Sequence, residues 1–89
     1  MGLTAELEIK NKKGLHARAA AAFVKVAEQF NATIEVERLG QTVNGCSIMG
    51  LMMLAAAQGT MITIRAHGDE AQIALAELTA LINNRFGEE

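Results

Sequence analysis

The sequence predicts an α+β fold in which helices cover one face of a mainly antiparallel sheet. Four segments alternate between apolar and polar residues, which is the period of a half-buried strand. Two others repeat apolar residues at the spacing of one helix face, and turn residues, mostly glycine, separate the segments. Strands with one apolar face and helices with one apolar stripe are satisfied by two packed layers. The predicted order is β-α-β-β-α-β-α, in a single domain over residues 1–89.

The first half of the chain is predicted to run from strand to helix to hairpin. Residues 3–9 alternate as a strand and are followed by a turn that ends at Gly14. From residue 17 to about residue 30 the pattern is that of an amphipathic helix. Residues 32–37 alternate again, and residues 41–43 follow a glycine turn as their hairpin partner. The predicted core stripe of the helix comprises Phe23, Ala27 and Phe30.

The second half is predicted to contain two more helices and a strand. Residues 60–66 repeat the strand pattern. The last helix is expected to begin at Asp69, whose carboxylate caps it while Gln72 reaches back, and to end before Gly87. Its expected buried residues are Ala71, Leu75, Leu78 and Ile82.

The segment from Ser47 to Ala57 is predicted to be a helix with an exposed apolar side, because residues 48–57 contain no charged residue. A helix in a two-layer domain buries only one face, so a core stripe of Ile48, Leu51 and Leu54 would leave methionines in solvent. Flexible thioethers suit a surface that meets several partners. The alternative is a helix buried on all sides. The expected partner-binding residues are Ala20, Ile48, Met49, Leu51 and Met52.

Composition limits the classes of function. The chain has 89 residues, 51% of them hydrophobic, 3% aromatic, and a formal net charge of −2, which argues against a nucleic-acid binder. No apolar run is long enough to insert into a membrane, and residues 1–10 do not resemble a signal peptide. We therefore expect a cytoplasmic protein, in agreement with the single Cys46, which has no partner for an internal disulfide.

The stretch Gly14-Leu15-His16-Ala17-Arg18 places an imidazole where a loop becomes a helix. The NH groups and partial positive charge of a helix N-terminus favour an anion there, and Arg18 could add a fork of donors. A positive helix end also disfavours the imidazolium form, which leaves a neutral, nucleophilic ring. These features predict that His16 carries a phosphoryl group. The alternatives are an ordinary turn histidine and a solvated first-turn arginine.

Other candidate residues have simpler interpretations. Ser47 is a good N-cap for its helix. Cys46, beside the same helix start, would have either a lowered thiol pKa or a plain packing role. His67 is expected on the surface. Two histidines and one cysteine show no metal-ligand spacing, so we expect no metal and no cofactor.

The chain resembles the HPr family, the histidine-containing phosphocarriers of the bacterial phosphoenolpyruvate-dependent phosphotransferase system. The resemblance covers essentially the whole chain and is most specific at residues 11–20, around His16, and at Ser47-Ile48-Met49-Gly50-Leu51. It implies an open-faced β-sandwich of four antiparallel strands with three helices. The C-terminal residues and Met52-Met53-Leu54-Ala55 are similar to proteobacterial members, including the nitrogen-related branch. Ala19 stands where the family usually has proline, which would leave the first helical turn looser.

The resemblance implies a phosphocarrier. A self-contained enzyme is not expected, because the 89 residues offer no second catalytic group paired to His16 and no phosphate-binding glycine loop. His16 would accept phosphate from phosphorylated enzyme I and pass it to a histidine of an enzyme IIA component, with Arg18 contacting the phosphate. Ser47 would be phosphorylated by an HPr kinase/phosphorylase in regulated members, although Cys46 stands where many of them have lysine. We expect a monomer. The alternative is a non-carrier regulator that acts through Ser47 phosphorylation and protein binding.

Overall fold

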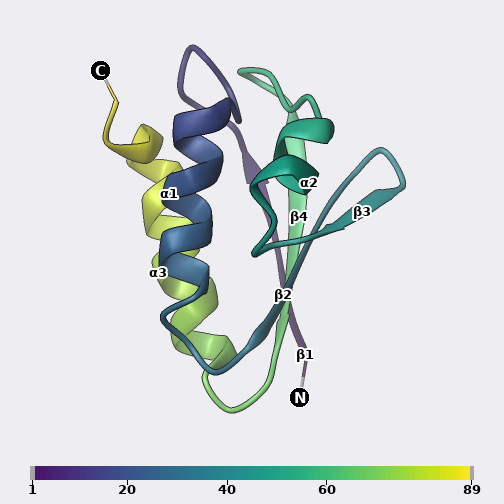
Figure 1. The fold of residues 1–89 in the computed structure, drawn as a ribbon, viewed down its shortest axis with the longest axis vertical. Helices are drawn as coiled ribbons and strands as arrows, with labels where there is room; N and C mark the ends of the chain where they lie inside the picture. Colours follow the sequence, from purple (N-terminus) through teal and green to yellow (C-terminus); the bar gives the residue numbers. More distant parts are fainter. Residues whose placement is uncertain (1, 89) are drawn as a thin grey trace.

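The computed structural model describes residues 2–88, so Met1 and Glu89 of the predicted domain lie outside the described part. Four strands and three helices follow one another in the predicted order, and a short 3₁₀ turn over Arg85–Gly87 comes last. Figure 1 shows their arrangement. The elements are β1 (Gly2–Glu8), α1 (Ala17–Ala27), β2 (Thr33–Arg38), β3 (Gln41–Asn44), α2 (Ile48–Met53), β4 (Met61–His67) and α3 (Ala71–Asn83).

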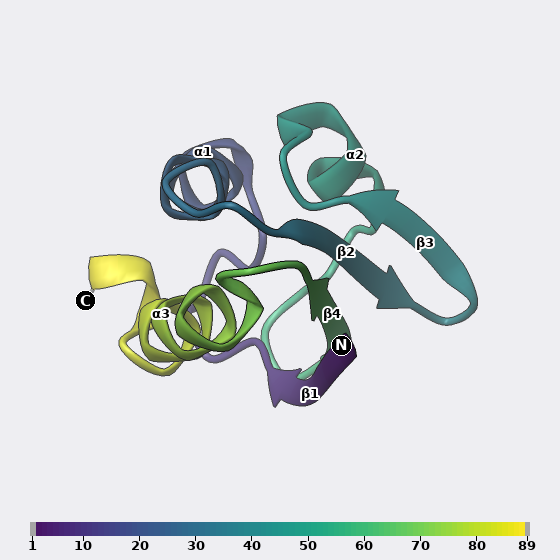
Figure 2. The same ribbon diagram turned by 90° about the horizontal axis from the view of Figure 1, so that it is seen from below.

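The four strands form one antiparallel sheet in the order β1-β4-β2-β3, and the helices lie over one face of it (Figure 2). Ile64 of β4 pairs with Ala5 on one side and with Val36 on the other, and Val36 pairs in turn with Val43. This apolar row crosses the whole sheet beneath the helices. Alternate residues point to the opposite, polar face, where Arg65 and Glu37 form an ion pair. The predicted fold class is therefore confirmed.

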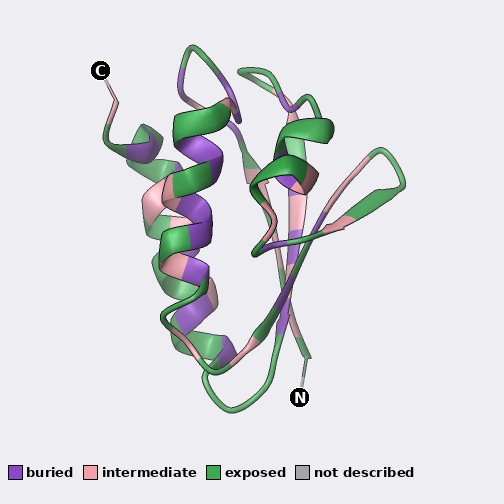
Figure 3. Ribbon diagram, viewed as in Figure 1, coloured by how far each residue is buried: buried purple, intermediate pink, exposed green. Residues whose placement is uncertain are grey.

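The core lies between the sheet and the three helices. Phe23 from α1, Leu51 from α2 and Leu78 from α3 are fully buried against the sheet. Figure 3 shows buried residues on one side of α1 and exposed residues on the other. Helix α1 ends at Ala27, so Phe30, predicted to continue the stripe, lies beyond the helix and is half-buried.

The start of α3 differs from the prediction. The helix begins at Ala71, and neither Asp69 nor Glu70 caps it with a side chain. Instead, Glu70 Oε1 accepts a hydrogen bond of 2.6 Å from the backbone NH of Asn31, and Asp69 Oδ2 accepts one of 3.4 Å from Asn31 Nδ2. These acidic residues therefore tie α3 to the loop before β2. Leu75, predicted to be buried, is only half-buried, because Ala74 occupies the core face there.

Helix α2 is shorter than predicted and has an exposed apolar side. It ends at Met53, and Ala55 takes a left-handed conformation with φ of 52° that stops it from continuing. Leu51 and Leu54 are buried, whereas Met49 is 73% exposed. The alternative of a helix buried on all sides is wrong. The exposed side, which we call the methionine patch, consists of Ile48, Met49, Met52 and Met53.

Two of the expected partner-binding residues do not lie on this surface. Ala20 and Leu51 are each 0% exposed, because both face the core between α1, α2 and the sheet. They support the surface from beneath and have no area left to contact a partner directly. Their assignment as contact residues is therefore corrected.

Candidate functional site

His16 is the N-cap residue of α1. Its backbone is extended, with φ of −80° and ψ of −177°, and its carbonyl accepts the first helical hydrogen bond, of 2.8 Å, from the NH of Ala20. Its side chain makes no capping hydrogen bond. The ring is thus available for chemistry, and its Nε2 atom lies 2.6 Å from Oε2 of Glu88.

The loop before His16 is fixed by a close backbone approach. The NH of Leu15 donates a hydrogen bond of 2.9 Å to the carbonyl of Ala56, and the Leu15 side chain is buried. Gly14 has φ of 66°, and a Cβ atom there would lie 2.5 Å from the same carbonyl oxygen. Only glycine fits this position without displacing the backbone. The loop therefore holds His16 against the segment that follows α2.

Asn11 is a site residue that sequence reasoning did not single out. It is fully buried, and its Nδ2 atom donates 2.8 Å to the Gly14 carbonyl and 3.0 Å to Glu88 Oε1. Its Oδ1 atom has no hydrogen-bond partner among the described residues. Asn11 thus joins the His16 loop to the C-terminal segment. Its only sequence signal was a polar side chain within the stretch quoted around His16.

Glu88 reaches the site because the chain turns back after α3. Arg85 and Phe86 both have positive φ, of 56° and 57°. The Phe86 side chain is buried, and Arg85 Nη1 donates 2.9 Å to the carbonyl of Lys10. The described chain therefore ends beside the start of α1 (Figure 1). The hydrogen bond from Asn11 is the main cause that lowers the pKa of Glu88, and His16 lowers it further.

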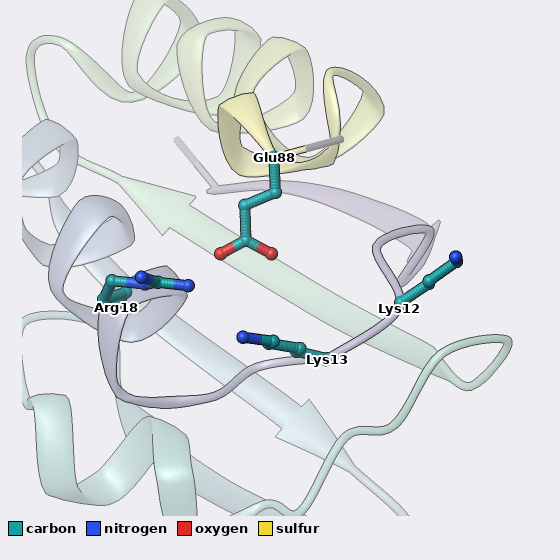
Figure 4. Close-up of a pocket in the computed structure, with 4 residues that line it drawn as sticks. All are labelled: Lys12, Lys13, Arg18 and Glu88. Atoms are coloured by element: carbon teal, nitrogen blue, oxygen red, sulfur yellow. The ribbon is translucent and has the colours of Figure 1, made fainter.

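Two hollows lie beside the start of α1. One, of about 240 Å³, is lined by Lys12, Lys13, Arg18 and Glu88 (Figure 4). The second, of about 230 Å³, is lined by Lys13, Leu15, His16 and residues 55–57. The structure places the predicted residues His16 and Arg18 at the start of α1, where they line different hollows, and Glu88 links them because it contacts His16 and its pKa is also lowered by the charge of Arg18. Both residues lie where an anion would meet cationic side chains and NH groups of the helix.

Ser47 begins the neighbouring helix. Its Oγ atom accepts a hydrogen bond of 2.9 Å from the NH of Gly50, so the predicted N-cap is confirmed. The interpretation of Cys46 as a thiol of lowered pKa is wrong, because partial burial and the charge of Glu28 raise that pKa.

Among residues 2–88, no three histidine, cysteine or acidic side chains are grouped so that they could hold a metal ion. No helix in this range is long and apolar enough to span a bilayer.

Comparison with known proteins identifies the family of this site. Residues 3–84 match the family model described as "PTS HPr component phosphorylation site". The phosphocarrier protein HPr of Neisseria meningitidis is 50% identical over 86 residues, which cover 97% of each chain. The crystal structure of HPr from Thermoanaerobacter tengcongensis superposes with a TM-score of 0.94, at 46% identity and 98% coverage of both chains. The chain belongs to the HPr family.

HPr proteins are phosphocarriers of the phosphotransferase system, so membership assigns that general role and argues against a self-contained enzyme. The chain is also similar to the HPr-like protein Crh of Bacillus subtilis, at 44% identity over 77 residues that cover 86% of this chain and 91% of Crh. The similar proteins therefore include both HPr and an HPr-like protein, so the more specific function of this chain depends on the residues of its site.

Proposed function

We propose that this HPr protein accepts a phosphoryl group on His16 from phosphorylated enzyme I and transfers it to a histidine of an enzyme IIA component. The observation that carries the proposal is the contact between His16 Nε2 and Glu88 Oε2, 2.6 Å long. A carboxylate accepts hydrogen bonds, so it favours the tautomer with the proton on Nε2. The lone pair then lies on Nδ1, which becomes the nucleophile.

Few groups take part in the phosphoryl transfer. The Nδ1 lone pair attacks phosphorus of the donor phosphohistidine, the new N–P bond forms, and the old N–P bond breaks with its electron pair returning to the donor ring. His16 is then a positively charged phosphohistidine until its Nε2 proton is lost to solvent. The Glu88 carboxylate balances that charge while it lasts. Transfer to the acceptor is the same reaction in reverse.

The start of α1 stabilises the phosphoryl group moderately. The first NH groups of a helix have no partner within the helix, and the helix dipole contributes about 0.3–1 kcal/mol for an exposed anion. Arg18 is exposed, lines the neighbouring hollow and offers a planar fork of donors. A moderate stabilisation suits a carrier, which must release the group that it accepts.

The methionine patch is the proposed docking surface for enzyme I and enzyme IIA. Its four side chains are exposed on α2, which lies beside the N-terminal half of α1 (Figure 1), and the segment after α2 is joined to the residue before His16 by the hydrogen bond from Leu15 to Ala56. Large exposed apolar side chains grouped in this way are typical of protein interaction sites. Of the predicted contact residues, Ile48, Met49 and Met52 remain in this proposal.

Ser47 is the proposed regulatory site. A phosphate there adds a charge of about −1.5 to −2 at the start of α2, beside the methionine patch, where it would obstruct docking. An HPr kinase/phosphorylase is the proposed modifying enzyme.

The second candidate function is a non-carrier regulator that acts through phosphorylation of Ser47 and binding to other proteins. The carrier function is favoured because His16 is present, with Nδ1 left available by the contact to Glu88. A cytoplasmic location and a monomeric state belong to the same proposal.

The direct test is to incubate the protein with phosphoenolpyruvate and enzyme I and to record its phosphorus NMR spectrum. A phosphohistidine signal from the wild type, absent from His16→Ala, is the expected result. Addition of an enzyme IIA should then remove the signal. No signal with an enzyme I that phosphorylates another HPr would contradict the carrier proposal and favour the regulator.

A further inference from the structure

Lys13 borders both hollows of the site. It lines the hollow that contains Arg18 and Glu88, and it also lines the one that contains His16 and Leu15. Among residues 2–88, no other side chain lines both of these hollows. Lys13 is exposed, so its flexible stem can place the ammonium group on either side.

The orientation of Lys13 differs from that of its neighbour. In Figure 4 the Lys13 side chain extends toward Arg18, below the carboxylate of Glu88, whereas the end of the Lys12 side chain points away from Arg18, although Lys12 also lines this hollow. Within residues 2–88, the Lys13 side chain makes no hydrogen bond or ion pair. Its ammonium is therefore placed toward the site without being engaged by another described group.

The position of the Lys13 backbone is set by the rigid loop. Lys13 lies between Asn11, which is fully buried, and Gly14, whose carbonyl accepts the Asn11 hydrogen bond of 2.8 Å. The NH of Gly14 in turn donates 3.1 Å to the Asn11 carbonyl. Because this turn is closed on both sides of Lys13, the side chain starts from a fixed point beside His16.

The charges of the site call for a second cation. A phosphoryl group brings a charge of about −1.5 to −2 to a site that already contains the Glu88 carboxylate. Arg18 supplies a single positive charge. We propose that Lys13 binds the phosphoryl group on His16 as a second cation beside Arg18. This inference rests on the proposed carrier function and adds a phosphate-contacting residue to it.

The test uses phosphoramidate, a small-molecule phosphoryl donor, so that no protein partner is needed to form the phosphohistidine. Phosphorus NMR then follows the titration of the phosphohistidine with pH in the wild type and in Lys13→Gln. A nearby cation favours the deprotonated forms of both the ring and the phosphoryl group. Its removal should therefore raise the titration midpoint, by about 0.5 pH unit for charges near 4 Å in a solvated site.

Lys25→Gln is the matched control. Lys25 is an exposed lysine in the last turn of α1, nine residues along the chain from His16, and its loss changes the net charge equally. It should leave the midpoint unchanged. Lys13→Arg keeps the positive charge and should keep the wild-type midpoint. Circular dichroism is expected to show the same fold for all three variants, because the substituted residues are exposed.

Two results would overturn the assignment of Lys13. One is an unchanged midpoint in Lys13→Gln, and the other is an equal rise in Lys13→Gln and Lys25→Gln, which would show a general effect of net charge. A failure of the carrier function would be recognised by a different result, because His16 would then form no phosphohistidine when the protein is incubated with enzyme I and phosphoenolpyruvate. If phosphoramidate also produced none, both proposals would be wrong.

Discussion

His16 Nε2 and Glu88 Oε2 lie 2.6 Å apart although the two residues are separated by 72 positions in the chain. The contact closes the C-terminal segment over the start of α1, and the other oxygen of Glu88 accepts the hydrogen bond from Asn11. The proposed phosphorylation site is thus assembled from the segment around the start of α1 and from the segment that follows α3. This arrangement leads to the first two predictions.

Stability is expected to depend on pH through Glu88. Its pKa is lower in the folded protein than the usual value of about 4.3, so its contribution is complete above that value and is lost as the pH falls through the lowered folded pKa. Glu88→Gln should therefore be less stable than the wild type in urea unfolding at pH 7. At a pH below the folded pKa the two proteins should be equally stable. A difference that grew on acidification would contradict this linkage.

Asn11 should control the pKa of Glu88 more than His16 does, because its hydrogen bond is the largest cause of the shift. Carbon NMR of the Glu88 carboxyl group can follow its titration in each variant. We expect Asn11→Leu to raise the Glu88 pKa toward its usual value and His16→Ala to raise it less. The reverse order would show that the ion pair with His16, and not the hydrogen bond from the Asn11 amide, is the main cause of the lowered pKa of Glu88.

Sequence patterns predicted the strands, the three helices and the position of His16 and Arg18 at the start of α1, because these depend on local periodicity and on residues close together in the chain. The hydrogen bonds that join Glu88 to His16 and to Asn11 did not follow from such patterns. Glu88 reaches His16 only because Arg85 and Phe86 adopt positive φ, a conformation that neither residue favours. Asn11 is likewise engaged by a distant partner. Only the packed chain brings such groups together.

The errors at α2 and α3 have a related cause. The apolar run 48–57 predicted a longer helix, but the carbonyl of Ala56 is required as acceptor for Leu15 and the chain leaves the helix before it. Asp69 matched a capping pattern, but it and Glu70 bind Asn31 of another loop. In both places a tertiary hydrogen bond replaces the local one that the sequence favoured.

Gly14→Ala should destabilise the protein and disturb the site. A left-handed conformation costs an alanine about 1 kcal/mol, and displacing the backbone carbonyl of Ala56 adds about 1–3 kcal/mol. Gly40→Ala is the control, since Gly40 has φ of 83° and nothing within 4 Å of an added Cβ, so only the first cost applies. Denaturant unfolding of both variants measures the difference. Equal losses would show that the close approach to Ala56 has no cost.

The methionine patch should affect docking and leave stability nearly unchanged. Met49→Asp replaces a side chain that is 73% exposed, so the change in unfolding free energy should be within about 0.5 kcal/mol, whereas Leu51→Ala in the core should cost about 2–5 kcal/mol. Met49→Asp should slow phosphorylation by enzyme I but not by phosphoramidate, as measured by phosphorus NMR. Equal slowing with both donors would place its effect at His16 instead of at the docking surface.

Two substitutions at Ser47 separate its structural and regulatory roles. Ser47→Ala removes the acceptor for the NH of Gly50 and should cost about 1 kcal/mol of stability, without slowing phosphorylation of His16 by enzyme I. Ser47→Asp keeps a favourable N-cap, so stability should be preserved, but the added negative charge beside the methionine patch should slow that phosphorylation. Urea unfolding and phosphorus NMR measure the two effects. If Ser47→Asp accepted phosphate at the wild-type rate, Ser47 would be a cap without a regulatory role, because the introduced charge would have no effect on docking.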